Sequence, residues 1–275
     1  MKKILCLIFS LIISATSFGQ DSLAISTTAD STHTNSHAAF SNTKLENATK
    51  IDGDSAYMKN DYISAIEVYE TILKKGEAAD LYYNLGNCYY KTDNIAKAIL
   101  NYERALLLQP GNSDIRANLE VAYSKTIDKV EPVPDIFFIS WIKSLINSMS
   151  VDGWAACGIV SFILLIVALY LFIFSKQIVL KKTGFILGVI LLIITISSNL
   201  FASQQKKRLI ERDLAIVMAP SITVRSTPSD SGTSLFVLHE GRKVTIKDNS
   251  MKEWKEIRLE DGKVGWVSAE AIEAI

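Results

Sequence analysis

Two long stretches without a charged residue constrain this chain more than any other feature of its sequence. Neither Trp154 to Phe174 nor Gly184 to Ala202 contains Asp, Glu, Lys or Arg. At a helical rise of about 1.5 Å per residue, either stretch can cross a hydrocarbon core roughly 30 Å thick. The sequence therefore predicts two antiparallel transmembrane helices, over 152–174 and 184–203, joined by the short loop 175–183.

Residues 1–19 have the pattern of a secretory signal peptide. Lys2 and Lys3 precede an apolar run from Ile4 to Ile13, and the small residues Ser17 and Gly19 follow it. An uncleaved N-terminal anchor is the alternative. Residues 20–45 are rich in Ser, Thr, Asn and Ala without an apolar period, so they are expected to form a disordered linker.

The leader also predicts the orientation of the chain. If it exports the segment that follows it, the first span runs inward and the second returns outward. The loop 175–183 carries Lys176, Lys181 and Lys182 and would be cytoplasmic, as the positive-inside rule prefers. The segments before and after the spans would both be periplasmic, on the inner membrane. One feature opposes this orientation, a cluster of cations after the second span: Lys206, Lys207, Arg208 and Arg212.

Small and aromatic residues recur at a fixed spacing between residues 46 and 128. The interval from Gly53 to Gly86 is the same as the interval from Tyr69 to Tyr102. This part of the chain resembles the tetratricopeptide repeat (TPR), most closely from Ala79 to Asn112. The small residues would let paired helices approach closely, and a third helix from Ser113 would cap the stack. The expected structural positions are Gly53, Ala65, Tyr69, Leu85, Gly86, Tyr89, Ala98, Tyr102, Ala105 and Pro110.

Repeats of this kind usually bind extended peptides on their concave face, which is what the resemblance implies here. The alternative is that Tyr83 and Tyr90 only pack against the neighbouring repeat. One subgroup of the family clamps a C-terminal carboxylate, but Asp54 stands where that clamp has an Asn, so this ligand is not expected. The matching candidate residues for partner binding are Asp80, Tyr83, Asn84, Asn87, Tyr90 and Lys91.

Residues 135–150 read as an amphipathic helix just before the first span. Phe137, Phe138 and Trp141 fall mostly on one side, while Lys143 and Asn147 fall on the other. An apolar, aromatic face beside a span is typical of a helix that lies in the membrane interface. A simple extension of the next helix is the alternative.

Residues 214–275 change to the alternating pattern of short strands. Val224-Arg225-Ser226, Gly241 and Gly265-Trp266-Val267 resemble the bacterial SH3-like (SH3b) family. Members often bind peptidoglycan or peptides, which makes Arg225, Trp254 and Trp266 candidate ligand contacts. The alternative is that both tryptophans fill the core of a small barrel and that Arg225 pairs locally. His239, without a nucleophile or metal partner nearby in sequence, is expected at the surface.

Composition and motifs do not indicate catalysis or nucleic-acid binding. The formal net charge is zero, and the three cysteines are isolated, so neither a nucleic-acid surface nor a disulfide framework is expected. The chain has no Gly-rich phosphate loop, nucleophile elbow or HExxH zinc motif. The sequence thus predicts no enzyme, no cofactor and no metal. An envelope hydrolase with an unrecognised site remains an alternative.

The order of the modules identifies a family more specifically than any single module does. The fold class is predicted as multidomain, with an all-α TPR solenoid (46–128), a two-helix transmembrane hairpin and a small all-β SH3-like barrel (214–275). With its leader, this order resembles the BatE-type proteins of the aerotolerance (Bat) group of Bacteroidetes and related bacteria. The resemblance implies a membrane scaffold with other Bat-type membrane proteins as partners, and a role in stress tolerance. A peptidoglycan-binding membrane sensor is the alternative function.

Overall fold

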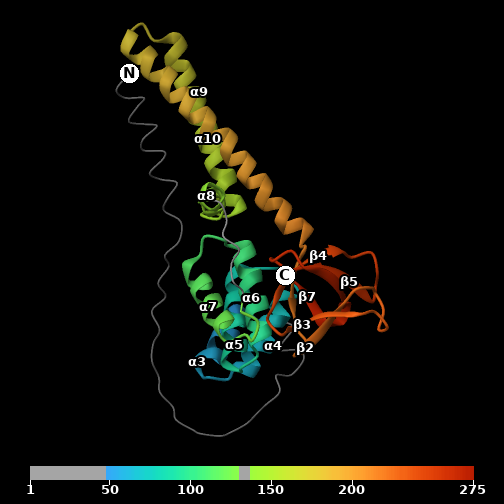
Figure 1. The fold of residues 1–275 in the computed structure, drawn as a ribbon. Coiled ribbons are helices and arrows are strands. Elements are labelled where there is room, and N and C mark those ends of the chain that lie inside the picture. The colour runs from blue at the N-terminus through green and yellow to red at the C-terminus, as the bar shows by residue number, and fades with distance from the viewer. Residues whose placement is uncertain (1–47, 130–136) are drawn as a thin grey trace, which may run out of the picture. The chain divides into compact units, whose positions relative to one another are not determined.

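The computed structural model describes residues 48–129 and 137–275. The predicted signal peptide 1–19, the linker 20–45 and the start of the amphipathic segment at 135–136 lie outside the described residues. The predicted fold class is confirmed: a helical repeat domain, two long apolar helices and an antiparallel sheet follow one another along the chain (Figure 1).

The helical domain consists of two helical hairpins and one further helix. Within each hairpin, a residue with left-handed backbone ends the first helix, namely Asn60 (φ 60°) and Asp93 (φ 61°). The next residue, Asp61 or Asn94, then accepts a hydrogen bond from a backbone N–H in the first turn of the second helix. The five helices are α3 (Lys50–Met58), α4 (Tyr62–Leu73), α5 (Ala79–Lys91), α6 (Ile95–Leu108) and α7 (Ser113–Ser124).

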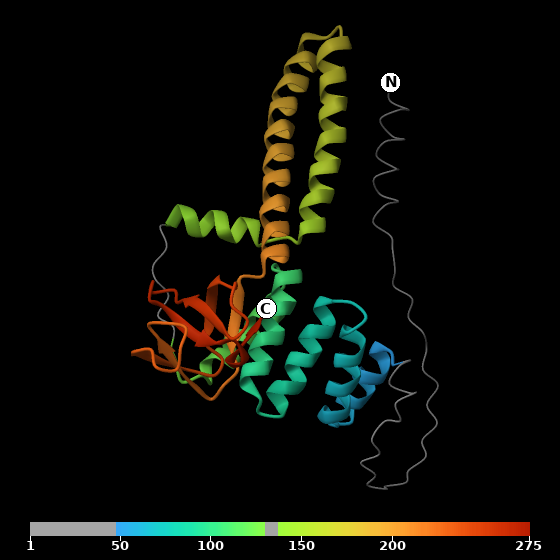
Figure 2. The same cartoon turned by 90° about the vertical axis from the view of Figure 1, so that its right-hand side faces the viewer.

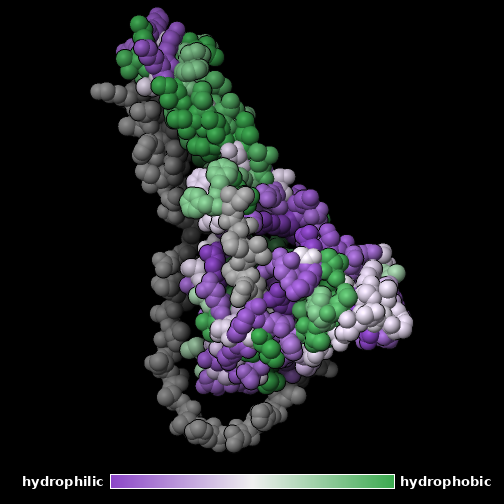
Figure 3. Space-filling model, in the orientation of Figure 1, coloured by the Kyte–Doolittle hydropathy of each residue, from purple (hydrophilic) through white to green (hydrophobic). Residues whose placement is uncertain are grey.

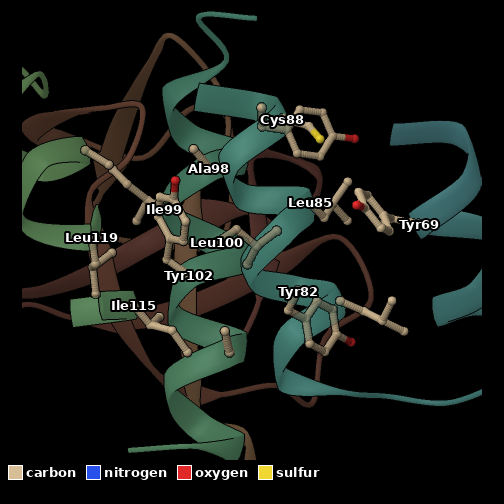
Figure 4. Close-up of a cluster of buried hydrophobic side chains, with 14 of the residues drawn as sticks. Tyr69, Tyr82, Leu85, Cys88, Ala98, Ile99, Leu100, Tyr102, Ile115 and Leu119 are labelled. Carbon is tan, nitrogen blue, oxygen red and sulfur yellow. The ribbon is translucent and has the colours of Figure 1, made fainter. Parts of the chain in front are cut away.

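Glycines inside two helices let an aromatic ring lie against the backbone. A Cβ atom added at Gly53 would stand 2.5 Å from the ring of Tyr69, and one at Gly86 would stand 2.7 Å from the ring of Tyr102. Both tyrosines are fully buried. Figure 4 shows Tyr69 and Tyr102 on either side of α5, with Leu85 and Cys88 between them. The repeat spacing in the sequence therefore corresponds to one packing contact made twice.

Among the described residues, two helices are long and apolar enough to cross a membrane, α9 (Val151–Phe174) and α10 (Ile178–Glu211). They pack side by side as a hairpin (Figure 1). Small residues line the contact, because a Cβ at Gly184 would lie 2.9 Å from the carbonyl oxygen of Ala168. The hydroxyl groups of Ser161 and Thr195 also share a hydrogen bond of 2.8 Å across it.

The connection within the hairpin is shorter than the sequence indicates. The predicted loop covered 175–183, whereas residues 175–177 alone lie between the two helices. Lys181 and Lys182 belong to the N-terminal part of α10, because lysine ends an uncharged stretch but does not end a helix. At the other end, α10 continues without a break through Lys206, Lys207 and Arg208 to Glu211.

A separate helix, α8 (Phe137–Ile146), precedes the hairpin and is not an extension of α9. In Figure 2 it lies across the foot of the hairpin. Gln205 of α10 fixes its C-terminal end by donating hydrogen bonds to the carbonyl oxygens of Ile146 and Met149, the latter at 2.7 Å. Trp154 Nε1 also donates to the Ile146 carbonyl, at 2.9 Å. These bonds satisfy carbonyl groups that a helix end leaves without a partner.

The C-terminal domain is an antiparallel sheet of seven strands in the order β3-β2-β6-β5-β4-β1-β7. Gly241 and Gly262 have φ values of +80° and +88° in the turns before β4 and β6, a conformation that glycine adopts most readily. The strands are β1 (Leu214–Val217), β2 (Ser221–Arg225), β3 (Ser234–His239), β4 (Lys243–Asp248), β5 (Trp254–Arg258), β6 (Val264–Ser268) and β7 (Ile272–Ala274).

The sheet packs directly against the helical domain (Figure 2). Ile216 of β1 and Ile275 are buried within the hydrophobic cluster of the helices. Arg104 Nη2 lies 3.0 Å from Glu273 Oε1, and Lys243 Nζ of β4 lies 2.7 Å from Glu103 Oε2 of α6. The two domains therefore share one apolar cluster, and ion pairs join them beside it.

His239, expected at the surface, is part of this contact and its side chain is 31% exposed. Its Nδ1 lies 2.8 Å from Asp128 Oδ1, and its backbone N–H donates to Asp128 Oδ2 at 2.8 Å. The two residues are 111 positions apart in the chain. The segment after α7, which the expected capping helix would have included, is held against the sheet through Asp128.

Candidate functional site

The concave side of the helical domain holds a cavity of about 290 Å³, here called the concave groove. All of its lining residues belong to α3, α5, α6 and α7, so neither the sheet nor the hairpin contributes to it. Aromatic rings, amides and one lysine make up most of the lining. The lining residues are Tyr57, Tyr83, Asn87, Tyr90, Lys91, Tyr102, Asn118 and Val121.

Asn87 is the centre of a hydrogen-bonded network on the floor of the concave groove. Its Oδ1 accepts from the Tyr102 hydroxyl at 2.7 Å and from Asn118 Nδ2 at 2.9 Å. Asn118 Nδ2 also donates to the Tyr83 hydroxyl at 3.0 Å. These bonds leave the Asn87 amide nitrogen and the Tyr83 hydroxyl hydrogen as donors for a ligand. A peptide carbonyl group is the ordinary partner for such donors.

The rim of the concave groove combines an aromatic ring with positive charge. Tyr90 is half-buried, and Lys125 Nζ lies 4.3 Å from the centre of its ring. This separation is within the range of a cation–π contact. Lys91 is exposed at the same rim. The groove therefore offers stacking surface, hydrogen-bond donors and the charge of Lys91 at its edge, whereas Lys125 is also paired with Asp93 at 3.7 Å.

Asp54, which stands where a clamp has an Asn, brings a carboxylate of the chain itself to the other two residues that match the clamp, Lys50 and Asn84. Asp54 accepts from Lys50 Nζ at 2.7 Å, from Asn84 Nδ2 at 3.0 Å and from the Tyr69 hydroxyl at 2.6 Å. Partial burial would raise the pKa of Asp54, but the hydrogen bonds from Lys50 and Tyr69 outweigh it and the pKa lies below its ordinary value of 3.8. Lys50 and Asn84 are therefore already engaged by a negative charge, which argues against a carboxylate ligand there.

The six candidate residues of the concave face divide into two groups. Tyr83, Asn87, Tyr90 and Lys91 come together in the concave groove. Asn84 instead bonds Asp54, and Asp80 is exposed in the first turn of α5, outside the lining.

Four further lining residues were not among these candidates, Tyr57, Tyr102, Asn118 and Val121, and of these Tyr102 was expected only as a structural position. The repeat spacing was the signal that could have found three of them. Tyr57 stands one repeat before Tyr90, while Asn118 and Val121 stand one repeat after Asn84 and Asn87. Equivalent positions on successive helices of a repeat stack face the same groove.

In the sheet, the two candidate tryptophans lie outside the core, so the alternative that both fill it is wrong. The buried cluster instead consists mainly of aliphatic residues, among them Val224, Ile257 and Val267. Trp254 and Trp266 are half-buried. Val267 follows Trp266 directly in β6, so the two side chains point to opposite faces of the sheet.

Trp254, Trp266 and Arg225 share the face that points away from this cluster. Trp266 lies opposite Arg225 on β2 and opposite Glu256 on β5, while Trp254 is two positions from Glu256 along β5. Arg225 Nη1 donates to the Gly232 carbonyl at 3.0 Å, so its guanidinium is partly held by its own domain. The result is a half-exposed aromatic face of the sheet.

Within residues 48–129 and 137–275, no three His, Cys, Asp or Glu side chains gather as a set that could hold a metal ion. Cys88 is buried in the helical domain, and desolvation raises the pKa of its thiol to about 12. A thiol in this state is mostly protonated at neutral pH and therefore a poor nucleophile.

Comparison with known families supports both soluble modules. The tetratricopeptide repeat matches residues 79–112, the segment predicted from the sequence, and the bacterial SH3 domain matches residues 220–273. Domains of these two kinds are typically non-catalytic modules that bind proteins or the cell wall.

One curated protein with similarity is the teichoic acids export ATP-binding protein TagH of Bacillus cereus, at 35% identity over 77 residues. The match covers 26% of this chain and spans only 14% of the length of that protein. The two helices that are long and apolar enough to cross a membrane, together with the bacterial SH3 match, indicate a membrane-associated envelope protein.

Proposed function

We propose that this chain is a membrane-anchored, non-catalytic scaffold of the bacterial envelope, which holds a protein partner in its concave groove. The observation that carries this proposal is that the groove is formed by the helical domain alone, while the sheet is packed against α6. The intramolecular contact thus leaves the groove open. Its donors and aromatic rings match an extended peptide segment.

The hairpin would act as the anchor, with both modules on one side of the membrane. The contacts of α6 with β4 and with Glu273 support this, because they require the helical domain and the sheet to lie on the same side. We infer that this side is the periplasm and that the membrane is the inner membrane. A periplasm-dependent reporter joined by a flexible linker after Ile275 would be active, and activity only of a cytoplasmic reporter would reverse the orientation.

The partner would be another membrane protein of the envelope, and we propose a Bat-type stress-tolerance complex as the setting. The order of repeat domain, hairpin and SH3 module supports this assignment. The half-exposed face around Trp254 and Trp266 would hold a second partner or the cell wall. A peptidoglycan sensor is less well supported, because the short connection 175–177 between α9 and α10 leaves little cytoplasmic surface for passing on a signal.

Pulldown of the full chain from native membranes tests the scaffold. The double variant Tyr83→Ala and Asn87→Ala removes ring surface and the amide donor from the groove, so it should lose the captured membrane proteins. The control is Lys74→Ala, at the edge of a separate cavity of about 390 Å³ on the other side of the helical domain. The Lys74→Ala variant should still capture the membrane proteins. Equal capture by the parent chain, the double variant and the Lys74→Ala control would refute binding through the groove.

A further inference from the structure

A larger cavity, of about 550 Å³, lies at the foot of the hairpin between α10, the helical domain and the sheet. Leu106 and Leu107 of α6 and Leu214 of β1 form apolar parts of its wall. Charged residues form another part, and five of them are cations drawn from three parts of the chain. These cations are Arg116, Lys207, Arg208, Arg212 and Lys243.

Three of the five cations are neutralised by carboxylates. Lys207 lies 3.6 Å from Glu211. Lys243 pairs with Glu103, and Arg212 forms two hydrogen bonds with Glu77. Much of the positive charge that follows the second apolar helix is therefore balanced inside the protein.

Arg116 and Arg208 differ from the other three cations. Arg116 Nη2 donates to the Pro110 carbonyl at 2.7 Å, and Arg208 Nη1 donates to the Asn147 side-chain oxygen at 3.3 Å. Among the described residues, no carboxylate forms an ion pair with either guanidinium, although Asp213 also lines the cavity. Both side chains are exposed, so each has further N–H groups available for an anion.

The cavity lies where the apolar surface of the hairpin ends. Figure 3 shows the hydrophobic surface of α9 and α10 giving way to hydrophilic residues at this end. On α8, at the same level, Phe137 and Phe138 are 86% and 63% exposed and Trp141 is 56% exposed. Aromatic side chains in such a position typically lie at the level of lipid headgroups.

We propose that this cavity binds the headgroup of an anionic phospholipid, with Arg116 and Arg208 as the ligands of its phosphate. Guanidinium groups hold phosphate oxygens through paired, charge-assisted hydrogen bonds. The leucine side chains of the wall accept the apolar part of the same molecule. This inference does not depend on the partner of the concave groove or on which side of the membrane the foot lies.

Native mass spectrometry of the full chain in an uncharged detergent tests the proposal. Phosphatidylglycerol should form a one-to-one complex that phosphatidylcholine of the same acyl chains does not. The double variant Arg116→Gln and Arg208→Gln should weaken this complex about thirtyfold, the effect expected for two cations near a lipid surface. Arg116→Lys with Arg208→Lys should restore much of the loss, because it keeps both charges.

A matched control replaces two cations at the opposite end of the hairpin, Lys181→Gln with Lys182→Gln, and should bind phosphatidylglycerol like the unmodified chain. Protection of the buried Cys88 thiol from labelling verifies that each variant is folded. Equal binding of the two lipids, or undiminished binding by the arginine double variant, would overturn the proposal. Displacement of the lipid by millimolar inorganic phosphate would also overturn it, because the site would then be one for free phosphate.

Discussion

Replacing Gly86 by alanine should loosen the helical domain, because the new methyl group would have no space. Its Cβ would stand 2.7 Å from two carbons of the Tyr102 ring and 3.3 Å from the Ala98 carbonyl oxygen. Carbon atoms in contact normally lie about 3.5–4.0 Å apart. The ring cannot move away freely, because it is 1% exposed and its hydroxyl group is bonded to Asn87.

The change in the free energy of unfolding combines two destabilising contributions and one stabilising contribution. Overpacking of this kind costs about 1–3 kcal/mol. Alanine regains about 1 kcal/mol over glycine within a helix. A displaced Tyr102 ring would lose its hydrogen bond to Asn87, which costs about another 1 kcal/mol. The expected net destabilisation is about 1–3 kcal/mol, which is a factor of about 5 to 150 in the population of the opened domain.

The Cys88 thiol provides the assay. It is fully buried with a raised pKa, so a maleimide reagent reaches it only when the helical domain opens. With Cys6 and Cys157 replaced by serine, the labelling rate of the full chain in detergent measures that opening. Gly86→Ala should label faster by the factor above. Gly76→Ala, where the added Cβ meets no atom within 4 Å, should label like the parent chain. A Gly86→Ala rate no higher than the parent rate would refute the packing argument.

Three other changes probe the contacts between modules and the face of the sheet. Ile216 lies in the sheet, but its side chain belongs to the hydrophobic cluster of the helices. Ile216→Ala should therefore also speed the labelling of Cys88, because losing this side chain costs about 2–5 kcal/mol of stability. An unchanged labelling rate would contradict a shared core. The hydrogen bond from Arg212 lowers the pKa of Glu77 below its ordinary value of 4.5, so the bond stabilises the folded chain above that pH and is lost as pH falls through the lowered value. The difference in melting temperature between the parent chain and Glu77→Gln should accordingly be constant from pH 7 to about 4.5 and shrink below it, and a constant difference down to pH 3 would argue against the pair. Trp254→Ala should reduce sedimentation of the full chain with purified peptidoglycan without changing its melting temperature, whereas failure of the parent chain to sediment would exclude the wall as the ligand.

The repeat helices and the apolar hairpin could be predicted because their signals are local and periodic. The glycine and tyrosine pairs that stand one repeat apart correspond to the same contact in both helical hairpins. The residues that form the core of the sheet were harder to predict. The size of Trp254 and Trp266 favours a place in the core, but the alternation along β6 places Trp266 on the face opposite Val267. Alternation outweighs size when every second side chain points to the same face.

The packing of the sheet against the helices could not be predicted from the sequence. Its polar contacts join residues that lie 111 to 169 positions apart, such as Asp128 with His239 and Arg104 with Glu273. No local pattern connects such pairs, because each residue alone looks like an ordinary surface charge. The same holds for the floor of the concave groove, where Asn118 of α7 bonds both Tyr83 and Asn87 of α5.

Site-specific photo-crosslinking in intact cells tests the central claim most directly, that a protein partner lies in the concave groove. A photoreactive residue at Lys91, exposed on the rim of the groove, should crosslink to a membrane protein. The same residue at Lys74, also exposed but beside the other cavity, should not. The crosslink from Lys91 should disappear when Asn87 is also replaced by alanine. Crosslinks of equal yield from both positions, or none from Lys91, would contradict the account.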